Sequence, residues 1–192
     1  MTDDLHPVAA RVLEFWFGPR GTPEYGRDRK RWWKKDPAFD AEVRARFLGD
    51  YERAAAGGLD ALAGAARDCV ALVIVLDQFP RNMFRDDARA FTTDAKALAI
   101  AKRALAAGFD GKLIPAERGF LYMPFQHSED LADQERSVAL FRELNFGEQL
   151  DFAQRHRDIV RRFGRFPHRN RVLGRAGTPA EIEFLKEPGS SF

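Results

Sequence analysis

The stretch "CVALVIVLDQFPRN" at residues 69–82 decides the fold. It opens with an eight-residue apolar run, Cys69–Leu76, whose β-branched residues would also suit a buried strand. A lone strand would leave its backbone N–H and C=O groups unpaired, and no second run of this character exists in the chain. The stretch is therefore predicted to be a helix, and because it is apolar all round it should lie at the centre of the protein.

Helix start and stop signals divide the rest of the chain into helices joined by short loops. Asp36-Pro37 is an N-cap followed by a proline that suits a first helical turn. Further helices are expected to start at Pro7, after a Thr93-Asp94 cap and at Pro115. Ser128 is expected to cap a helix over 129–145, another helix covers 148–163, and the last one starts at the capping box that begins with Thr178. Pro124 is expected to close the helix that Pro115 opens. The predicted fold is all-α, with about seven helices stacked as antiparallel hairpins and no sheet.

Length and composition fit one helical domain, 1–192, with a loop-rich connection at 18–35. Seventeen Phe and three Trp predict an aromatic core. The single cysteine, Cys69, excludes an internal disulfide and suits a reducing compartment. The N-terminus lacks an export-signal pattern, and eight apolar residues fall far short of the roughly 18–20 that span a membrane. A cytoplasmic protein is expected.

The net charge of +2 predicts no partner by itself, but the basic residues are unevenly distributed. Eight arginines and two histidines stand against one acid, Asp158, between Arg155 and Arg175. Such a segment can bind phosphates or nucleic acid, or its arginines can be solvated or paired with acids elsewhere. Nucleic acid is therefore retained only as a low-ranking partner.

A short motif occurs twice, as "FPRN" at residues 79–82 and as "FPHRN" at residues 166–170. Proline disfavours helical geometry in the residue before it, so Phe79 and Phe166 are each predicted to mark a helix end. Each copy would then direct an arginine and an amide from a tight turn to a defined place.

Asp77 stands in the last turn of the apolar helix, where the helix dipole disfavours a carboxylate. Buried without a partner, it would cost several kcal/mol or take up a proton. Arg81 and Arg169 are the candidate partners. Two interpretations remain open: a structural ion pair that locks two helix ends together, or a positioned acid, base or ligand clamp.

Three long segments, 70–85, 117–141 and 156–185, resemble the bacterial family called domain of unknown function 924, as do "VLEFWFG" at 12–18 and residues 31–47. The resemblance implies an all-helical, TPR-like fold and no particular activity. It marks as signature positions 77–82, 127–129, 156–158, 164–170 and Gly174-Arg175. The chain departs from the family pattern at Ala61-Leu62, where a tryptophan is often found, and at Arg171, which replaces a small residue.

The polar signature residues suggest a pocket at the ends of several helices. Arginines suit bidentate binding of carboxylate or phosphate, and histidines exchange protons near neutral pH. The leading hypothesis is a pocket that binds an anionic small molecule or a peptide terminus. Its predicted ligand-binding residues are Arg81, Asn82, Arg165, Arg169 and Asn170, with Asp77 and His127 helping to orient the ligand.

Three alternatives stay open. The same pocket could serve an enzyme with His127 or His168 as proton carrier and Asp77 or Glu129 as its partner. A TPR-like module would instead bind a protein partner in a broad groove, and the basic segment keeps nucleic acid as the third. No metal or other cofactor is expected, because the spacing of His127-x-Glu129 places the two side chains on different sides of a helix. The oligomeric state is left open.

Overall fold

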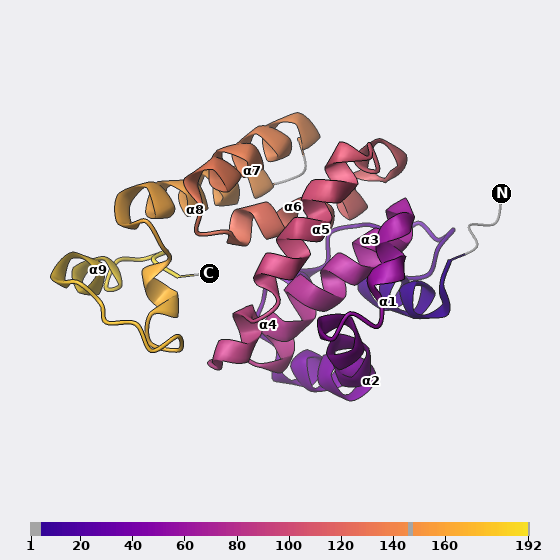
Figure 1. The fold of residues 1–192 in the computed structure, drawn as a ribbon, viewed down its shortest axis with the longest axis horizontal. Coiled ribbons are helices and arrows are strands. Elements are labelled where there is room, and N and C mark those ends of the chain that lie inside the picture. The colour runs from indigo at the N-terminus through magenta and orange to yellow at the C-terminus, as the bar shows by residue number, and fades with distance from the viewer. Residues whose placement is uncertain (1–4, 146–147, 192) are drawn as a thin grey trace.

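The computed structural model describes residues 5–145 and 148–191, and the helices labelled in Figure 1 make up most of this part of the chain. Their bounds are α1 Pro7–Phe17, α2 Pro37–Ala55, α3 Ala66–Val73, α4 Phe79–Met83, α5 Asp94–Ala106, α6 Pro115–His127, α7 Leu131–Leu144, α8 Gln149–Phe163 and α9 Pro179–Phe184. The described residues contain no strand, which confirms the all-α prediction. Residues 1–4, 146–147 and 192 of the predicted domain lie outside the described part, and both its single-domain organisation and its TPR-like stacking stay predictions.

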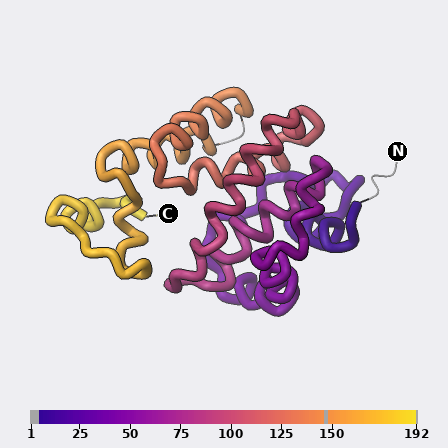
Figure 2. The backbone as a smooth tube through the Cα atoms, viewed as in Figure 1, coloured from indigo at the N-terminus to yellow at the C-terminus, as the bar shows by residue number. Residues whose placement is uncertain are grey.

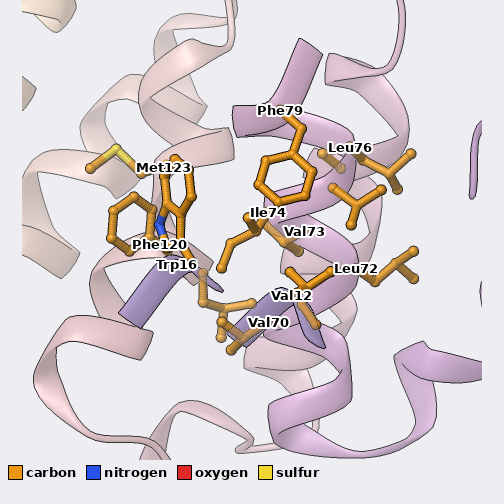
Figure 3. Close-up of a cluster of buried hydrophobic side chains, with 14 of the residues drawn as sticks. Val12, Trp16, Val70, Leu72, Val73, Ile74, Leu76, Phe79, Phe120 and Met123 are labelled. Carbon is orange, nitrogen blue, oxygen red and sulfur yellow. The ribbon is translucent and has the colours of Figure 1, made fainter. Parts of the chain in front are cut away.

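The apolar helix lies at the centre, as predicted. α3 contacts α1, α5 and α6, and every side chain from Cys69 to Leu76 is at most 1% exposed. Figure 3 shows Trp16, Phe120 and Met123 on one side of this core, facing Ile74 and Phe79 on the other. The indole of Trp16 meets the rings of Phe79 and Phe120 edge-on, at centroid distances of 5.6 and 5.4 Å. Aromatic packing therefore fills the space around the central helix, as expected from the many phenylalanines.

The prediction that the central helix ends at Phe79 is wrong. The chain passes from α3 through a π-helical turn, Ile74–Gln78, directly into α4. Pro80 has no N–H with which to bond a carbonyl one turn back, but the hydroxyl of Thr93 donates a hydrogen bond to the Leu76 carbonyl oxygen instead. The wider π turn and this outside donor let the helix continue past the proline, and such turns occur often at functional sites.

Two further predicted boundaries are wrong. α6 runs through Pro124 to His127, so the proline does not close it. Ser128 is not the cap of the next helix: Asp130 is, and its Oδ1 accepts hydrogen bonds from the amides of Ala132 and Asp133. Both differences lengthen or shift elements by about one turn, and the first places His127 on the last turn of a helix rather than in a loop.

Other local signals hold. The Asp36 carboxylate accepts hydrogen bonds from two amides at the start of α2, and no α-helix lies in the loop-rich connection 18–35. At α9 the hydroxyl of Thr178 and the carboxylate of Glu181 cap each other's amides, as in the predicted capping box. These contacts are local in sequence, which is why sequence reasoning finds them.

The chain from α8 onward lies at the end of the molecule away from α1 (Figure 2). It has a small apolar cluster of its own, formed by Ile159, Val160, Phe166 and Phe184. Phe166 is extended, as predicted for a residue before proline, and a 3-10 turn, Pro167–Arg169, follows it. This turn brings the second copy of the repeated motif beside the ends of α4 and α6.

Candidate functional site

The two copies of the repeated motif meet at Asp94, the first residue of α5. Nη1 and Nη2 of Arg81 donate to its two carboxylate oxygens at 2.8 and 2.9 Å. Nη1 of Arg169 donates to Oδ2 of the same carboxylate at 3.4 Å. A carboxylate at a helix N-terminus is further favoured by the helix dipole. The two motifs therefore converge on the carboxylate of Asp94, whereas the sequence named Asp77 as the carboxylate that Arg81 or Arg169 would pair with.

The principal partner of Asp77 is His127. Asp77 is 0% exposed, and its Oδ1 lies 2.8 Å from Nδ1 of His127, while Gln78 donates to its other oxygen at 2.6 Å. Arg81 is more distant, at 3.6 Å from Oδ1. Burial raises the pKa of Asp77, but His127, Arg81 and the hydrogen bonds from His127 and Gln78 outweigh it and hold the pKa below its usual range. Asp77 is thus a buried carboxylate whose charge is satisfied.

Burial favours the neutral form of His127, and one of its ring nitrogens has no partner among the described residues. Burial, followed by the charge of Arg81, lowers its pKa below the ordinary value. Because Nδ1 faces the carboxylate of Asp77, the proton of the neutral ring is assigned to Nδ1, which leaves a lone pair on Nε2. Nε2 has no hydrogen-bond partner among the described residues, and His127 borders a cavity. A histidine held in this way is a hydrogen-bond acceptor and a base.

Arg169 is buried but under-bonded. Its side chain is 7% exposed, and its guanidinium contacts the rings of Phe91 and Phe166, with Cζ 4.7 and 4.5 Å from their centroids. Its Nε is buried with no acceptor in the described part of the chain. Burial, followed by the charge of Arg81, lowers the pKa of Arg169 to about 10. Unlike Arg81, it therefore retains N–H groups that can bind a ligand.

His127 and Arg169 border the same cavity, of about 440 Å3. Its polar lining comes from these two residues with Asp94, Ser128 and Glu129. The rest of the lining is apolar apart from Thr92, and comprises Ala88, Phe91, Ala95, Leu98, Pro124 and Leu173. Small-molecule sites commonly measure about 300–1,000 Å3 and combine an apolar wall with a few convergent polar groups. The cavity has both properties.

Glu129 is held in place by the C-terminal segment. It accepts from Nη1 and Nη2 of Arg175 at 2.6 and 2.9 Å, and from the amide of Phe166 at 2.8 Å. Burial raises the pKa of Glu129, but the hydrogen bonds from Arg175 and Phe166 outweigh it, so the pKa is lowered. Glu129 lines the cavity as a carboxylate paired with Arg175. The sequence had suggested it as the acid–base partner of a histidine.

Besides Asp77 and Arg81, four predicted site residues do not line this cavity. Asn82 donates to Asp40 at 2.8 Å on the side of α2, and Arg165 pairs with Glu181 at 2.7 and 2.9 Å. Asn170 accepts from Nε of Arg175 at 3.0 Å. The ring of His168 packs on Phe166, with a centroid distance of 5.6 Å. Burial, followed by the charge of Arg169, lowers the pKa of His168 to about 4.

The sequence analysis missed several residues that build the site. In the sequence, Asp94 indicates only a helix start. The wall residues Phe91, Leu98 and Leu173 match no motif that would mark them as site residues. Arg175 was recognised as a signature position but not as the partner of Glu129. The signal available for Asp94 was an acid in a first helical turn, which is equally typical of simple capping.

Most arginines of the basic segment are paired with carboxylates. Arg157 pairs with Asp158, Arg161 with Glu135 and Arg171 with Asp86, in addition to the pairs already described. The paired interpretation of this segment therefore accounts for most of its charge. In the described part of the chain, no group of three or more His, Cys, Asp or Glu is placed to hold a metal ion. No described helix has the length and apolar character needed to cross a membrane.

Comparison of the chain with known proteins gives a family match and a similar solved structure. The profile of the family described as "bacterial protein of unknown function (DUF924)" matches residues 12–189. A solved structure of a protein of unknown function from Agrobacterium tumefaciens is similar, with 41% sequence identity and a TM-score of 0.84. The match covers 93% of this chain and 97% of the other. No curated protein matches.

Proposed function

The chain belongs to the DUF924 family, and from the geometry of its cavity we propose that it binds a small molecule through an anionic or other hydrogen-bond-accepting group at Arg169. The observation that carries the proposal is a guanidinium at the cavity wall whose hydrogen bonding, among the described residues, is limited to one long bond from Nη1 to Asp94. A buried donor without an acceptor costs about 1–3 kcal/mol, and more when it is charged. A ligand that supplies the missing acceptor recovers this free energy on binding.

This proposal narrows the set of anchoring residues expected from the sequence. Arg81 is already engaged in two short bonds to Asp94, and Arg165 in two to Glu181. Neither guanidinium is available for an anion without losing a carboxylate partner. Arg169 is the arginine of the predicted set that borders the cavity with bonding capacity to spare.

A thermal-shift screen tests the proposal. The wild-type protein is scanned against a set of small carboxylic acids, phosphate esters, amino acids, short peptides and neutral analogues. We expect some acceptor-bearing compounds to raise the Tm of the wild type but not of Arg169→Met. Arg171→Met is the matched control, because Arg171 stands two residues away, is 75% exposed and does not line the cavity.

The outcomes are separable. A Tm increase that Arg169→Met abolishes and Arg171→Met retains supports the proposal. The proposal is contradicted if no compound raises the Tm, or if all three proteins respond alike. The Tm of each protein without ligand shows whether the substitutions themselves perturb folding.

The Asp77–His127 pair favours a second candidate function, acid–base catalysis on the bound molecule. A carboxylate that orients the imidazole through Nδ1 and leaves Nε2 to the reacting group is the arrangement of a general base, and the lowered pKa of His127 favours its unprotonated form. Wild-type protein and His127→Gln are each incubated with a metabolite extract, and the metabolites are followed by mass spectrometry. Turnover by the wild type alone supports catalysis, and unchanged metabolite levels with both proteins contradict it.

A further inference from the structure

The arrangement of Arg169 restricts the shape of the group it can bind. The rings of Phe91 and Phe166 both pack against the guanidinium, with its Cζ 4.7 and 4.5 Å from their centroids. The N–H groups of a guanidinium lie in its plane, and because Nε is buried, a ligand in the cavity is bound through the Nη groups. A planar carboxylate matches the in-plane donors of a guanidinium and can accept two parallel hydrogen bonds.

The charges around the cavity restrict the number of negative charges. Three guanidinium groups, those of Arg81, Arg169 and Arg175, stand beside three carboxylates, those of Asp77, Asp94 and Glu129. The cluster is balanced while His127 is neutral. One added carboxylate brings one excess negative charge, which a single proton on His127 cancels. A dianion would leave one negative charge that a single proton on His127 does not cancel. It would also lie beside the carboxylates of Asp94 and Glu129, which line the cavity.

The remaining wall is suited to an apolar body. Leu98 and Leu173 border the cavity together with Ala88, Ala95, Pro124 and Phe91, and the ring of Phe91 also packs against the guanidinium of Arg169. These side chains offer no partner to a second polar group. Burying hydrocarbon against them gains roughly 25 cal/mol per Å2 of apolar surface.

From these three restrictions we infer that the ligand is an apolar monocarboxylate, and that its carboxylate is held jointly by Arg169 and a protonated His127. The inference rests on the proposed function and names the chemical class of the ligand. In the complex, Nδ1–H of the imidazolium donates to Asp77 as before, and the new Nε2–H donates to the ligand. Binding therefore takes up one proton.

The groups that face His127 set the direction of its pH dependence. They are Asp77 and Arg81 from the segment between α3 and α4, Asp94 from α5, His156 from α8, and His168, Arg169 and Glu129. In the free protein, burial and Arg81 favour the neutral ring. A ligand carboxylate beside Nε2 adds a negative charge that favours the imidazolium, so the pKa of His127 rises on binding. By linkage, the affinity then increases as the pH falls.

Isothermal titration calorimetry tests the inference with octanoate as the probe. Three compounds serve for comparison. Octanol lacks the negative charge, succinate has a second carboxylate, and inorganic phosphate is an anion without a carboxylate. Titrations at pH 6.0 and 7.5, each in two buffers of different ionisation enthalpy, give the number of protons taken up. We expect octanoate to bind at least tenfold more tightly than the three other compounds, with proton uptake at pH 7.5 and a lower Kd at pH 6.0.

Four variants assign the effects to residues. Arg169→Met and Arg169→Lys should each lose at least tenfold in octanoate affinity, since the lysine keeps a charge but not the planar pair of donors. His127→Gln should bind without proton uptake and without the pH dependence. Arg171→Met should behave as the wild type. Circular dichroism verifies that each variant is folded, and His127→Asn replaces His127→Gln if the latter is not.

The inference is overturned if succinate, phosphate or octanol binds as tightly as octanoate, if octanoate does not bind, or if His127→Gln retains the proton uptake. These results are distinct from a failure of the proposed function. A compound of another class that raises the Tm of the wild type but not of Arg169→Met would contradict the monocarboxylate inference and still support a binding site at Arg169. If no compound binds, the proposed function and the monocarboxylate inference are both contradicted.

Discussion

The guanidinium groups of Arg81 and Arg169, which occupy matching places in the two copies of the FP(H)RN motif, share the carboxylate of Asp94. Arg81 binds it at 2.8 and 2.9 Å, whereas Arg169 reaches it only at 3.4 Å. This asymmetry separates two roles. Arg81 fastens α4 to the start of α5, and Arg169 keeps hydrogen-bonding capacity at the wall of the cavity.

Thr93→Val tests how the helix continues past Pro80. The substitution removes the hydroxyl that donates to the Leu76 carbonyl oxygen, and a buried carbonyl without a donor costs about 1–3 kcal/mol. We expect the free energy of unfolding, measured by urea denaturation, to fall by that amount. Thr92→Val is the control, because the Thr92 hydroxyl makes only a long, 3.4 Å bond at an exposed site. An equal loss in both variants would argue against the role given to Thr93.

Asp77→Ala tests the buried centre of the site. It leaves His127 and Arg81 without this carboxylate, and removing one partner of a buried charged pair typically costs about 3–5 kcal/mol. Asp158→Ala, at a carboxylate that is 57% exposed, should cost less than about 1 kcal/mol. Urea denaturation at pH 7 compares the two, and similar values would show that Asp77 does not hold the centre together.

Glu129→Gln tests how the C-terminal segment is attached. The variant keeps the size of the side chain but removes the charge that pairs with Arg175, and hydrogen bonds to charged groups contribute about 1.5–3 kcal/mol. We expect faster hydrogen exchange at the Phe166 amide and through residues 164–175, with little change in α1–α5. Glu135→Gln, which removes an exposed partner of Arg161, is the matched control. Uniformly faster exchange over the whole chain would contradict the local role.

The lowered pKa of His168 predicts how the stability of the protein changes with pH. Burial, followed by the charge of Arg169, lowers the pKa of His168 to about 4, against about 6.5 in an unfolded chain. Between these values the unfolded state binds a proton that the folded state does not, so stability falls as the pH falls from 6.5 toward 4. His168→Asn removes this difference. The variant should lose less of its stability between pH 7 and pH 5, by up to about 1.4 kcal/mol per pH unit for one proton. Urea denaturation at both pH values is the measurement, and equal losses in the two proteins would contradict it.

The sequence by itself determined the all-α class, the central place of residues 69–76, and the helix starts at Asp36 and Thr178. These features depend on apolar content, on proline and on capping side chains a few residues from the groups they bond. The same local information named Arg81 and Arg169, one from each copy of the repeated motif, as candidate partners of one buried carboxylate. It also singled out Asp77, because a carboxylate in an apolar helix needs a partner wherever that partner lies.

The tertiary structure alone decided which partner each charged group has. Asp77 bonds His127, fifty positions along the chain, and Asp94 binds both Arg81 of α4 and Arg169 of the turn Pro167–Arg169. The π turn before Pro80 likewise relies on Thr93, a donor from the next helix start. Electrostatic and hydrogen-bond partners are chosen by distance in space, after apolar packing has set which helices are neighbours, and a one-dimensional pattern does not contain that distance.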